Sequence, residues 1–231
     1  MTKIIAKDKN VVVPGEVLAE GMDYLPGFGT YREEQKIISE MLGLFTVDGR
    51  TLKLIPLSGK YVPKTGDTII CKVIDVSFNG WIVSTNSAYS AMLSMKDATS
   101  DYIAKGADLT KYYSIGDYMV AKVTTVTSQK QINISMIGPG LRKLQGGRII
   151  EVAANKVPRI IGKQGSMVSL LKDTTGCRII VGQNGLVWIQ GEGDKELIAV
   201  NAIRKIEEES HLSGLTDKIK QFLEKETKKK L

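Results

Sequence analysis

The sequence is poor in the side chains on which most catalytic and metal sites depend. It has one histidine, His211, and two cysteines, Cys71 and Cys177, which stand far apart and form no Cys-x-x-Cys pair. This spacing disfavours a zinc site or a disulfide and is typical of reduced core thiols. A Gly-x-Ser-x-Gly nucleophile motif is also absent. We therefore predict no catalytic residue, no metal site and no cofactor, with His211 as an ordinary surface or helix-end residue.

Long apolar runs are missing as well. No stretch approaches the roughly 18 consecutive apolar residues of a membrane-spanning helix. Residues 1–7 do not resemble the apolar core of a signal peptide. The chain has 231 residues, of which 42% are hydrophobic and 25% charged. These values are ordinary for a soluble protein of two or three small domains, so we expect a cytoplasmic protein without a membrane partner.

Positive charge is what the sequence has in excess, and it is concentrated in one segment. The formal net charge is +7. Residues 142–191 hold eight basic and two acidic side chains, whereas residues 1–61 hold eight of each. A segment with this excess attracts a phosphate backbone. Lysines scattered over an ordinary solvated surface would give the same count, so charge alone leaves both interpretations open.

A Gly-x-x-Gly step lies inside the basic segment. Gly162 and Gly165 bracket Lys163 and Gln164, after a β run at 148–152 and before an apolar helical run. Two glycines let the backbone turn tightly and approach a ligand without Cβ atoms in the way. The N-terminus of the following helix favours an anion, and a phosphodiester is the natural candidate. Lys163 would add a mobile cation to this loop.

The elements around this loop have a recognisable order. The pattern predicts a helix at 166–174, strands at 177–181 and 186–190 with a turn at 182–185, and a long helix from about Asp194. The order β-α-α-β-β-α, with the signature Ile-Ile-Gly-Lys-Gln-Gly at 160–165, resembles a KH domain. The resemblance implies that the loop holds about four nucleotides of single-stranded RNA. The RNA-binding residues that it implies are Arg159, Ile161, Gly162, Lys163, Gln164, Gly165 and Arg178.

Residues 62–138 alternate as an all-β unit. Gly-Asp turns at 66–67 and 116–117 precede the two longest β runs, and residues 96–112 form a partly helical insertion. Five strands with such turns suggest a barrel of the OB type. The predicted strands are 68–76, 78–83, 91–93, 118–126 and 131–136.

The same segment resembles an S1 domain, the RNA-binding OB fold. The resemblance rests on the Gly-Asp turns together with Val-Ile-Asp-Val and Phe-Asn-Gly-Trp at 73–76 and 78–81. It implies that Phe78 and Trp81 lie on an exposed face where bases stack on aromatic rings, with Lys72 and Lys122 as nearby cations. Trp81 packed inside the barrel is the alternative, because residues three apart need not share a face.

Three polar contacts of the usual S1 face are missing. The position of a common histidine in the third strand corresponds to Leu93, and those of a common aspartate and arginine to Thr127 and Asn133. The resemblance therefore does not imply tight or base-selective binding by the barrel alone.

Residues 1–61 show no chemistry of their own. Asp48-Gly49 between two apolar runs is a strong hairpin signal, while 33–43 fits either a short helix or a pair of strands. The segment is neutral and predicts a small β domain that packs against a partner. At the other end, Thr216 can cap a last amphipathic helix, and the lysines at 228–230 are expected to be solvated.

The domain order itself resembles one family. A β domain with Val-Pro-Gly-Glu at 13–16, then an S1 domain (62–138), then a KH domain with a C-terminal helix (144–231) resembles the S1/KH cap subunits of the archaeal RNA exosome. The fold class is multidomain, mainly β plus α+β. The resemblance implies a non-catalytic subunit that binds single-stranded RNA, favours A-rich tails and feeds RNA to a degradative ring.

The family also implies the partners. Three cap copies, alone or mixed with another cap subunit, would sit on a hexameric ring of RNase-PH-like subunits, held there by residues 1–61. Two alternatives stay open at this point. S1 and KH modules also occur in stand-alone proteins of translation and attached to polynucleotide phosphorylase, although this chain leaves no room for a phosphorolytic domain.

Overall fold

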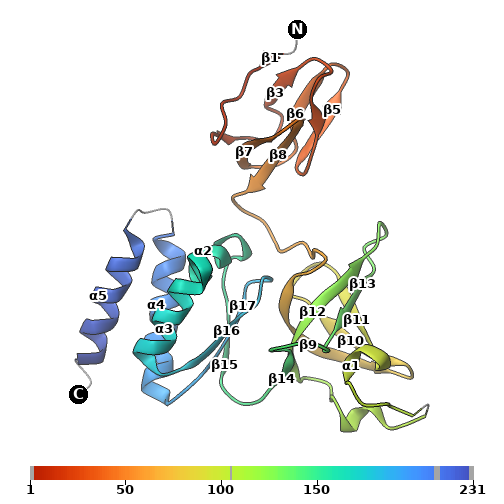
Figure 1. Ribbon diagram of the computed structural model, residues 1–231, viewed down its shortest axis with the longest axis vertical. Coiled ribbons are helices and arrows are strands. Elements are labelled where there is room, and N and C mark those ends of the chain that lie inside the picture. Colours follow the sequence, from red (N-terminus) through yellow and green to blue (C-terminus); the bar gives the residue numbers. More distant parts are fainter. Residues whose placement is uncertain (1–2, 105, 211–213, 229–231) are drawn as a thin grey trace. The chain divides into compact units, whose positions relative to one another are not determined.

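The structure is a computed structural model that describes residues 3–104, 106–210 and 214–228. The chain forms two compact units, Met1–Gly59 and Lys60–Leu231, whose ribbons are drawn in Figure 1. The predictions for His211 and for the side chains of the lysines at 228–230 lie outside the described residues. Within the described ranges, no helix is long and apolar enough to cross a membrane.

The N-terminal unit consists of two four-stranded sheets, with the orders β1-β3-β6-β5 and β2-β7-β8-β4. Its core is small and aliphatic around one aromatic ring, Phe45. The predicted Asp48-Gly49 hairpin is confirmed as the β7–β8 turn, and residues 33–43 prove to be strands rather than a helix. The strands are β1 (Lys3–Ile4), β2 (Val11–Val12), β3 (Val17–Glu20), β4 (Leu25–Pro26), β5 (Thr30–Glu33), β6 (Lys36–Ser39), β7 (Gly43–Asp48) and β8 (Thr51–Pro56).

The second unit begins with a closed barrel, which confirms the predicted OB-type fold. Its strand order is β13-β11-β10-β9-β12, and a β12–β13 pairing closes it. The insertion is partly helical, with α1 (Met95–Ala98) and a 3-10 turn at Leu109–Lys111. The barrel strands are β9 (Thr68–Ser77), β10 (Gly80–Ser84), β11 (Ser90–Ser94), β12 (Tyr118–Val126) and β13 (Ile132–Ser135).

The remainder of this unit has the predicted β-α-α-β-β-α order. A short strand, β14 (Arg142–Leu144), first pairs with β12 and leads out of the barrel. A three-stranded sheet of order β15-β17-β16 then carries the helices on one face. Its elements are β15 (Arg148–Glu151), α2 (Val157–Ile161), α3 (Ser166–Thr175), β16 (Arg178–Val181), β17 (Leu186–Gln190), α4 (Gly193–Glu208) and α5 (Leu215–Lys228).

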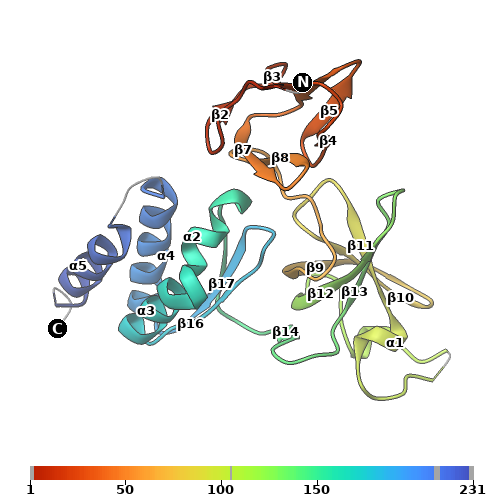
Figure 2. The ribbon, with the colours of Figure 1, turned by 45° about the horizontal axis from the view of Figure 1, so that its top comes forward.

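The other face of this sheet packs on the barrel. Trp188 of β17 forms a buried cluster with Ile70 of β9, Val120 of β12 and Leu144 of β14. Figures 1 and 2 show the helices on one side of the sheet and the barrel on the other. The sheet is therefore covered on both faces, and the surfaces left for a ligand are the helical side, the strand edge and the outer face of the barrel.

Candidate nucleic-acid interface

The loop between α2 and α3 has a backbone that requires glycine at its first position. Gly162 has φ 76° and ψ 174°, and a Cβ atom there would lie 2.7 Å from the backbone N of Met167. Gln164 and Gly165 are also left-handed, with φ 54° and 81°. This path leaves the side chains of Lys163 and Gln164 exposed at the start of the ten-residue helix α3. The loop thus presents a cation and an amide beside free helix N–H groups, as binding of a phosphate requires.

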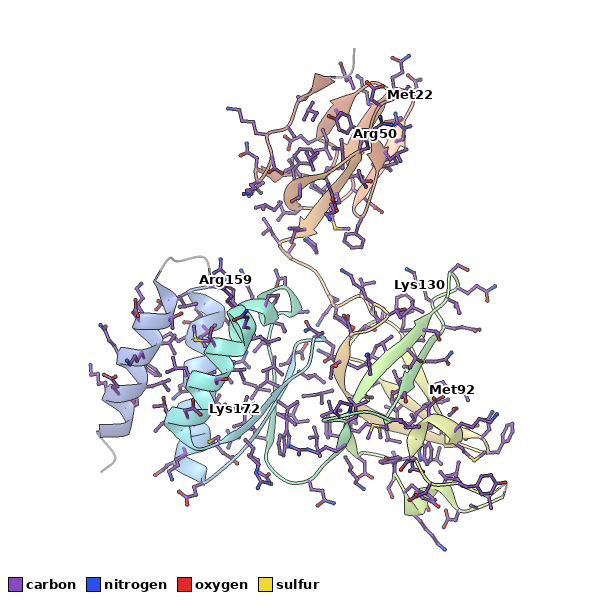
Figure 3. All side chains as sticks on the ribbon, viewed as in Figure 1. Met22, Arg50, Met92, Lys130, Arg159 and Lys172 are labelled. Atoms are coloured by element: carbon purple, nitrogen blue, oxygen red, sulfur yellow. The ribbon has the colours of Figure 1, made fainter. Side chains whose placement is uncertain are left out.

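Other side chains complete the surface next to this loop. Arg159 is exposed on the last turn of α2, where Figure 3 labels it. Among the described residues, no ion pair neutralises Arg159 or Lys163. Ile161 is half-buried and packs on the core together with Val168 of α3 and Val181 of β16. Ile161 ends α2 directly before the loop, and a Cβ atom on Gly165 would lie 3.9 Å from Val168 Cγ1. Cations and partly exposed aliphatic groups therefore flank the loop, which suits a sugar-phosphate backbone with its bases.

Sequence reasoning missed Val168 beside the loop and the partly exposed Val181 of the same core. Val168 and Val181 belong to elements with an apolar period that predicts core residues. Which of the apolar residues lies at the partly exposed edge of the core depends on how α3 packs across the sheet. That crossing is a tertiary feature that no local pattern encodes.

Arg178 does not lie at the loop, and the prediction that grouped it there is wrong. The chain leaves the loop along α3, which is about 15 Å long for ten residues. Arg178 begins β16 just after this helix ends, so it lies at the far end, bordering a shallow pocket with Gln190 and Lys195. Figure 3 labels Lys172 near the same end of α3 and Arg159 at the opposite one.

Trp81 is a core residue, so its predicted place on the exposed barrel face is wrong. Its side chain is 0% exposed, and its Nε1–H donates to the backbone O of Tyr113 at 2.9 Å. The two rings meet edge to face with centroids 5.3 Å apart. The reason is strand alternation, since Trp81 pairs with Leu93 on β11 and both point inward.

Phe78, by contrast, is available to a ligand. It lies in the β9–β10 turn and is 89% exposed. Nearby, the outward residue of β11 is Met92, which pairs with Ile82 and with Asn133 of β13. Leu93 itself is buried, so the position given above to the usual histidine faces the interior. This part of the barrel face presents Ile82, Met92 and Asn133, and the exposed Asp75 of β9 pairs with Ile82.

The two barrel lysines lie away from Phe78. Lys72 and Lys122 are exposed on β9 and β12. Lys72 is six residues from Phe78 along an extended strand, about 20 Å. Its Nζ lies 5.6 Å from the ring centroid of Tyr118. The structure therefore does not bring the predicted barrel residues together into one site.

Comparison with known proteins places these features in a family. Residues 9–58 match the model described as the exosome RNA binding protein RRP4 N-terminal domain, and residues 147–210 match the KH domain model. The exosome complex component Rrp4 of Methanothermus fervidus is 42% identical over 221 residues, covering 95% of this chain and 97% of that protein. The chain belongs to the Rrp4 family. The Rrp4 of Thermococcus kodakarensis is 42% identical over 227 residues, covering 96% of this chain and 88% of that protein.

A solved structure agrees with this assignment. A crystal structure described as an exosome complex RNA-binding protein has a TM-score of 0.68 and 35% identity to this chain. It covers 75% of this chain, which in turn covers 100% of it. The resemblance to the exosome family that the domain order and its motifs indicate is thereby confirmed.

Proposed function

We propose that this chain is a non-catalytic, RNA-binding cap subunit of an exosome, a complex that degrades RNA from the 3′ end. The observation that carries the proposal is the Gly162–Gly165 loop. Its backbone requires glycine at Gly162 and exposes Lys163 and Gln164 at a helix start, in a chain of the Rrp4 family. The proposal gives this loop the sugar-phosphate backbone of single-stranded RNA as its ligand.

Each part of the surface has a distinct role in this proposal. Lys163 and the N–H groups at the start of α3 hold a phosphate. Arg159 adds a second cation one helical turn before the loop. Ile161, Val168 and Val181 contact bases, and Phe78 gives one further base a ring to stack on. None of these residues forms a catalytic constellation, so the chain would bind RNA without cleaving it.

The proposed function also requires that the chain assemble with other subunits. In this proposal the N-terminal unit joins the chain to a hexameric ring of RNase-PH-like subunits in the cytoplasm. Three caps, alone or mixed with another cap subunit, would surround the entrance for RNA. Each copy binds only a few nucleotides, but three on one ring raise the effective RNA concentration and so the avidity. A-rich tails would be preferred, and their 3′ ends would pass to the ring.

Reconstitution tests the proposal. The full chain is mixed with the ring subunits of the same organism, and decay of a fluorescent A-rich RNA is followed in phosphate and Mg²⁺. We expect faster decay than with the ring alone, and no decay with the chain alone. An activity that releases nucleoside diphosphates and follows the chain through several columns would contradict the non-catalytic role. Failure of the chain to bind the ring or RNA would contradict the cap role.

A further inference from the structure

A crevice lies where the barrel meets the KH sheet, and the proposed function leaves it without a role. It has a volume of about 470 Å³, within the range that holds a small ligand. Trp188 in its wall lies on the sheet face that packs on the barrel, whereas α2 and α3, which the Gly162–Gly165 loop joins, cover the opposite face. The crevice is therefore separate from the Gly-x-x-Gly loop. We call it the junction crevice, and its wall includes Asp117, Tyr118, Leu144, Gly146, Gly147 and Trp188.

One wall of the junction crevice is bare backbone. Gly146 and Gly147 follow β14, where the chain passes from the barrel to the sheet (Figure 1), and both are exposed, with φ angles of 64° and 72°. A Cβ atom on Gly147 would lie 2.5 Å from Ile189 O and 3.0 Å from Trp188 Nε1, so no side chain fits there. Trp188 Nε1–H donates to Gly146 O at 2.8 Å and holds this wall in place. A ligand can thus approach these peptide groups without a side chain in the way.

The wall on the barrel side carries an aromatic ring next to a cation. Tyr118 begins β12 and pairs with Lys72 of β9 and with Leu144 of β14. Its side chain is half-buried and lines the crevice. Lys72 Nζ lies 5.6 Å from the centroid of the Tyr118 ring, but Lys72 is not among the residues that line the crevice. The ring therefore leaves part of its surface to a planar ligand, and the exposed lysine stands beside it.

A carboxylate oxygen of the same wall can accept a hydrogen bond from a ligand. Asp117 accepts hydrogen bonds from Lys143 Nζ and from Ser114 N–H, and both donors bind Oδ2. The ion pair with Lys143 compensates the charge of Asp117, while Oδ1 keeps its lone pairs for a donor. A ribose hydroxyl or the amino group of a base is a donor that fits such an oxygen.

The surface continues from the crevice to the edge of the KH sheet. Gln190 lies two residues after Trp188 on β17, so both side chains share the barrel-facing side of the sheet. A Cβ atom on Gly147 would lie 3.1 Å from Gln190 Cβ, and Gln190 pairs with Arg178 of the edge strand β16. Arg178 and Lys72 are exposed, and neither forms an ion pair within the part of the chain that the structure describes. A cation therefore flanks the crevice on each side.

This chemistry favours single-stranded RNA as the ligand. A base stacks on an aromatic ring, and cations without an ion-pair partner bind phosphates. A free nucleotide carries its phosphates at one end only. A strand has a phosphate at every nucleotide and can therefore use Lys72 and Arg178 at the same time.

We propose that the junction crevice is a second binding site for single-stranded RNA. One base stacks on Tyr118, and its amino group or its ribose donates to Asp117. Phosphates along the strand bind Lys72 and Arg178. RNA as the ligand rests on the proposed function above, whereas the place of the site rests on the cavity, the ring and the two cations. The site extends the RNA-binding surface beyond the roughly four nucleotides that the Gly162–Gly165 loop holds.

The test uses the full chain with Tyr118→Leu and Lys72→Met, which remove the ring and the charge but keep apolar side chains. The matched control is Tyr31→Leu with Lys220→Met, an exposed tyrosine of the N-terminal unit and an exposed lysine of α5. Affinity for a fluorescent A-rich RNA is measured by anisotropy, and folding by thermal unfolding. We expect at least about a fivefold loss of RNA affinity in the test variant only.

A second measurement locates the RNA on the chain. An A-rich RNA that carries 4-thiouridine is photocrosslinked to the wild-type chain and to the loop variant with Lys163→Asp and Gln164→Asp, and the crosslinked peptides are identified by mass spectrometry. We expect crosslinks within residues 144–149 in both chains, because the crevice does not depend on the loop. The test variant should show at least about a fivefold reduction of these crosslinks.

The outcomes separate this inference from the proposed function. RNA binding by the wild-type chain without crosslinks at 144–149, or unchanged affinity of the test variant, would overturn the junction crevice alone. Absence of RNA binding by the wild-type chain would overturn the proposed function and this inference with it. Binding of ADP that requires Tyr118 and Lys72, without RNA crosslinks at 144–149, would assign the crevice to a free nucleotide and overturn the inference. If the double variant does not fold, Lys72→Met alone is held to the same criteria.

Discussion

The side-chain amide of Asn184 satisfies both backbone hydrogen-bonding groups of Ile70. Its Oδ1 accepts from Ile70 N–H at 3.2 Å, and its Nδ2 donates to Ile70 O at 2.6 Å and to Thr85 O at 2.8 Å. Asn184 belongs to the β16–β17 turn of the KH part, whereas Ile70 lies in the barrel strand β9. The pairing with β10 begins at Lys72, so this amide takes the place of a strand along the open edge of β9. This amide thus adds hydrogen bonds between the KH part and the barrel to the buried cluster around Trp188.

Replacement of Asn184 should loosen this connection. Asn184→Ala leaves the N–H and C=O of Ile70 without these partners in a buried place, and each such group costs about 1–3 kcal/mol. We expect a loss of at least about 2 kcal/mol in the stability of the second unit, with faster hydrogen exchange at Ile70. The control is Gln183→Ala, because Gln183 reaches Thr68 O through its backbone N–H, at 2.9 Å. Equal stability of the two variants would contradict the role of the amide.

The Gly-x-x-Gly loop makes a second prediction. Lys163→Asp with Gln164→Asp places two negative charges where a phosphate would bind. We expect at least about a tenfold loss of RNA affinity, roughly 1.4 kcal/mol, and a weaker salt dependence, with the fold intact. Lys220→Asp with Gln221→Asp is a matched control, since this exposed pair on α5 gives the same charge change elsewhere. Equal losses in both variants would mean that net charge, rather than the loop, governs binding.

Much of the fold could be predicted from local patterns. The Gly-Asp turns and β runs predict the barrel, and the order of elements with Gly162 and Gly165 predicts the KH fold. The sequence around Gly80 does not show which side chains of the following strand point into the barrel and which point outward. The inward position of Trp81 therefore cannot be predicted from the pattern alone. The place of Arg178 and the docking role of Asn184 have another cause. Their positions depend on contacts with distant segments, and a turn such as 182–185 looks the same whether it is solvated or docked.

Separate replacements of Phe78 and Trp81 should distinguish an effect on RNA affinity from an effect on the stability of the barrel. Phe78→Ala should cost about 1–3 kcal/mol of RNA binding if a base stacks on this exposed ring, without affecting stability. Trp81→Ala should instead destabilise the barrel by about 3–5 kcal/mol, because it leaves a cavity and removes the hydrogen bond to Tyr113 O. Anisotropy with single-stranded RNA and thermal unfolding measure the two effects. Normal RNA affinity of Phe78→Ala would remove the barrel ring from the interface.

The last prediction concerns acid. Burial raises the pKa of Asp117, but hydrogen bonds from Lys143 Nζ and from Ser114 N–H outweigh it and hold this pKa below its ordinary value of 3.8. A carboxylate with a lowered folded-state pKa contributes stability above its unfolded pKa and loses it as the pH falls through the folded value. Lys143 lies in β14, the strand that leads from the barrel to the KH part. The ion pair between Asp117 and Lys143 therefore holds this strand to the barrel.

Asp117→Asn should therefore destabilise the second unit by about 1 kcal/mol at pH 7, and this difference from the wild-type chain should shrink as the pH falls below about 4. Denaturant unfolding at pH 7 and near pH 3 measures both values. Asp48→Asn is the control, since Asp48 pairs with Lys53 at 2.6 Å on the exposed surface of the other unit. Exposed ion pairs contribute little, so this control should leave the unfolding of the second unit unchanged. A difference between Asp117→Asn and the wild-type chain that is as large near pH 3 as at pH 7 would show that packing, and not the charge of Asp117, stabilises this strand.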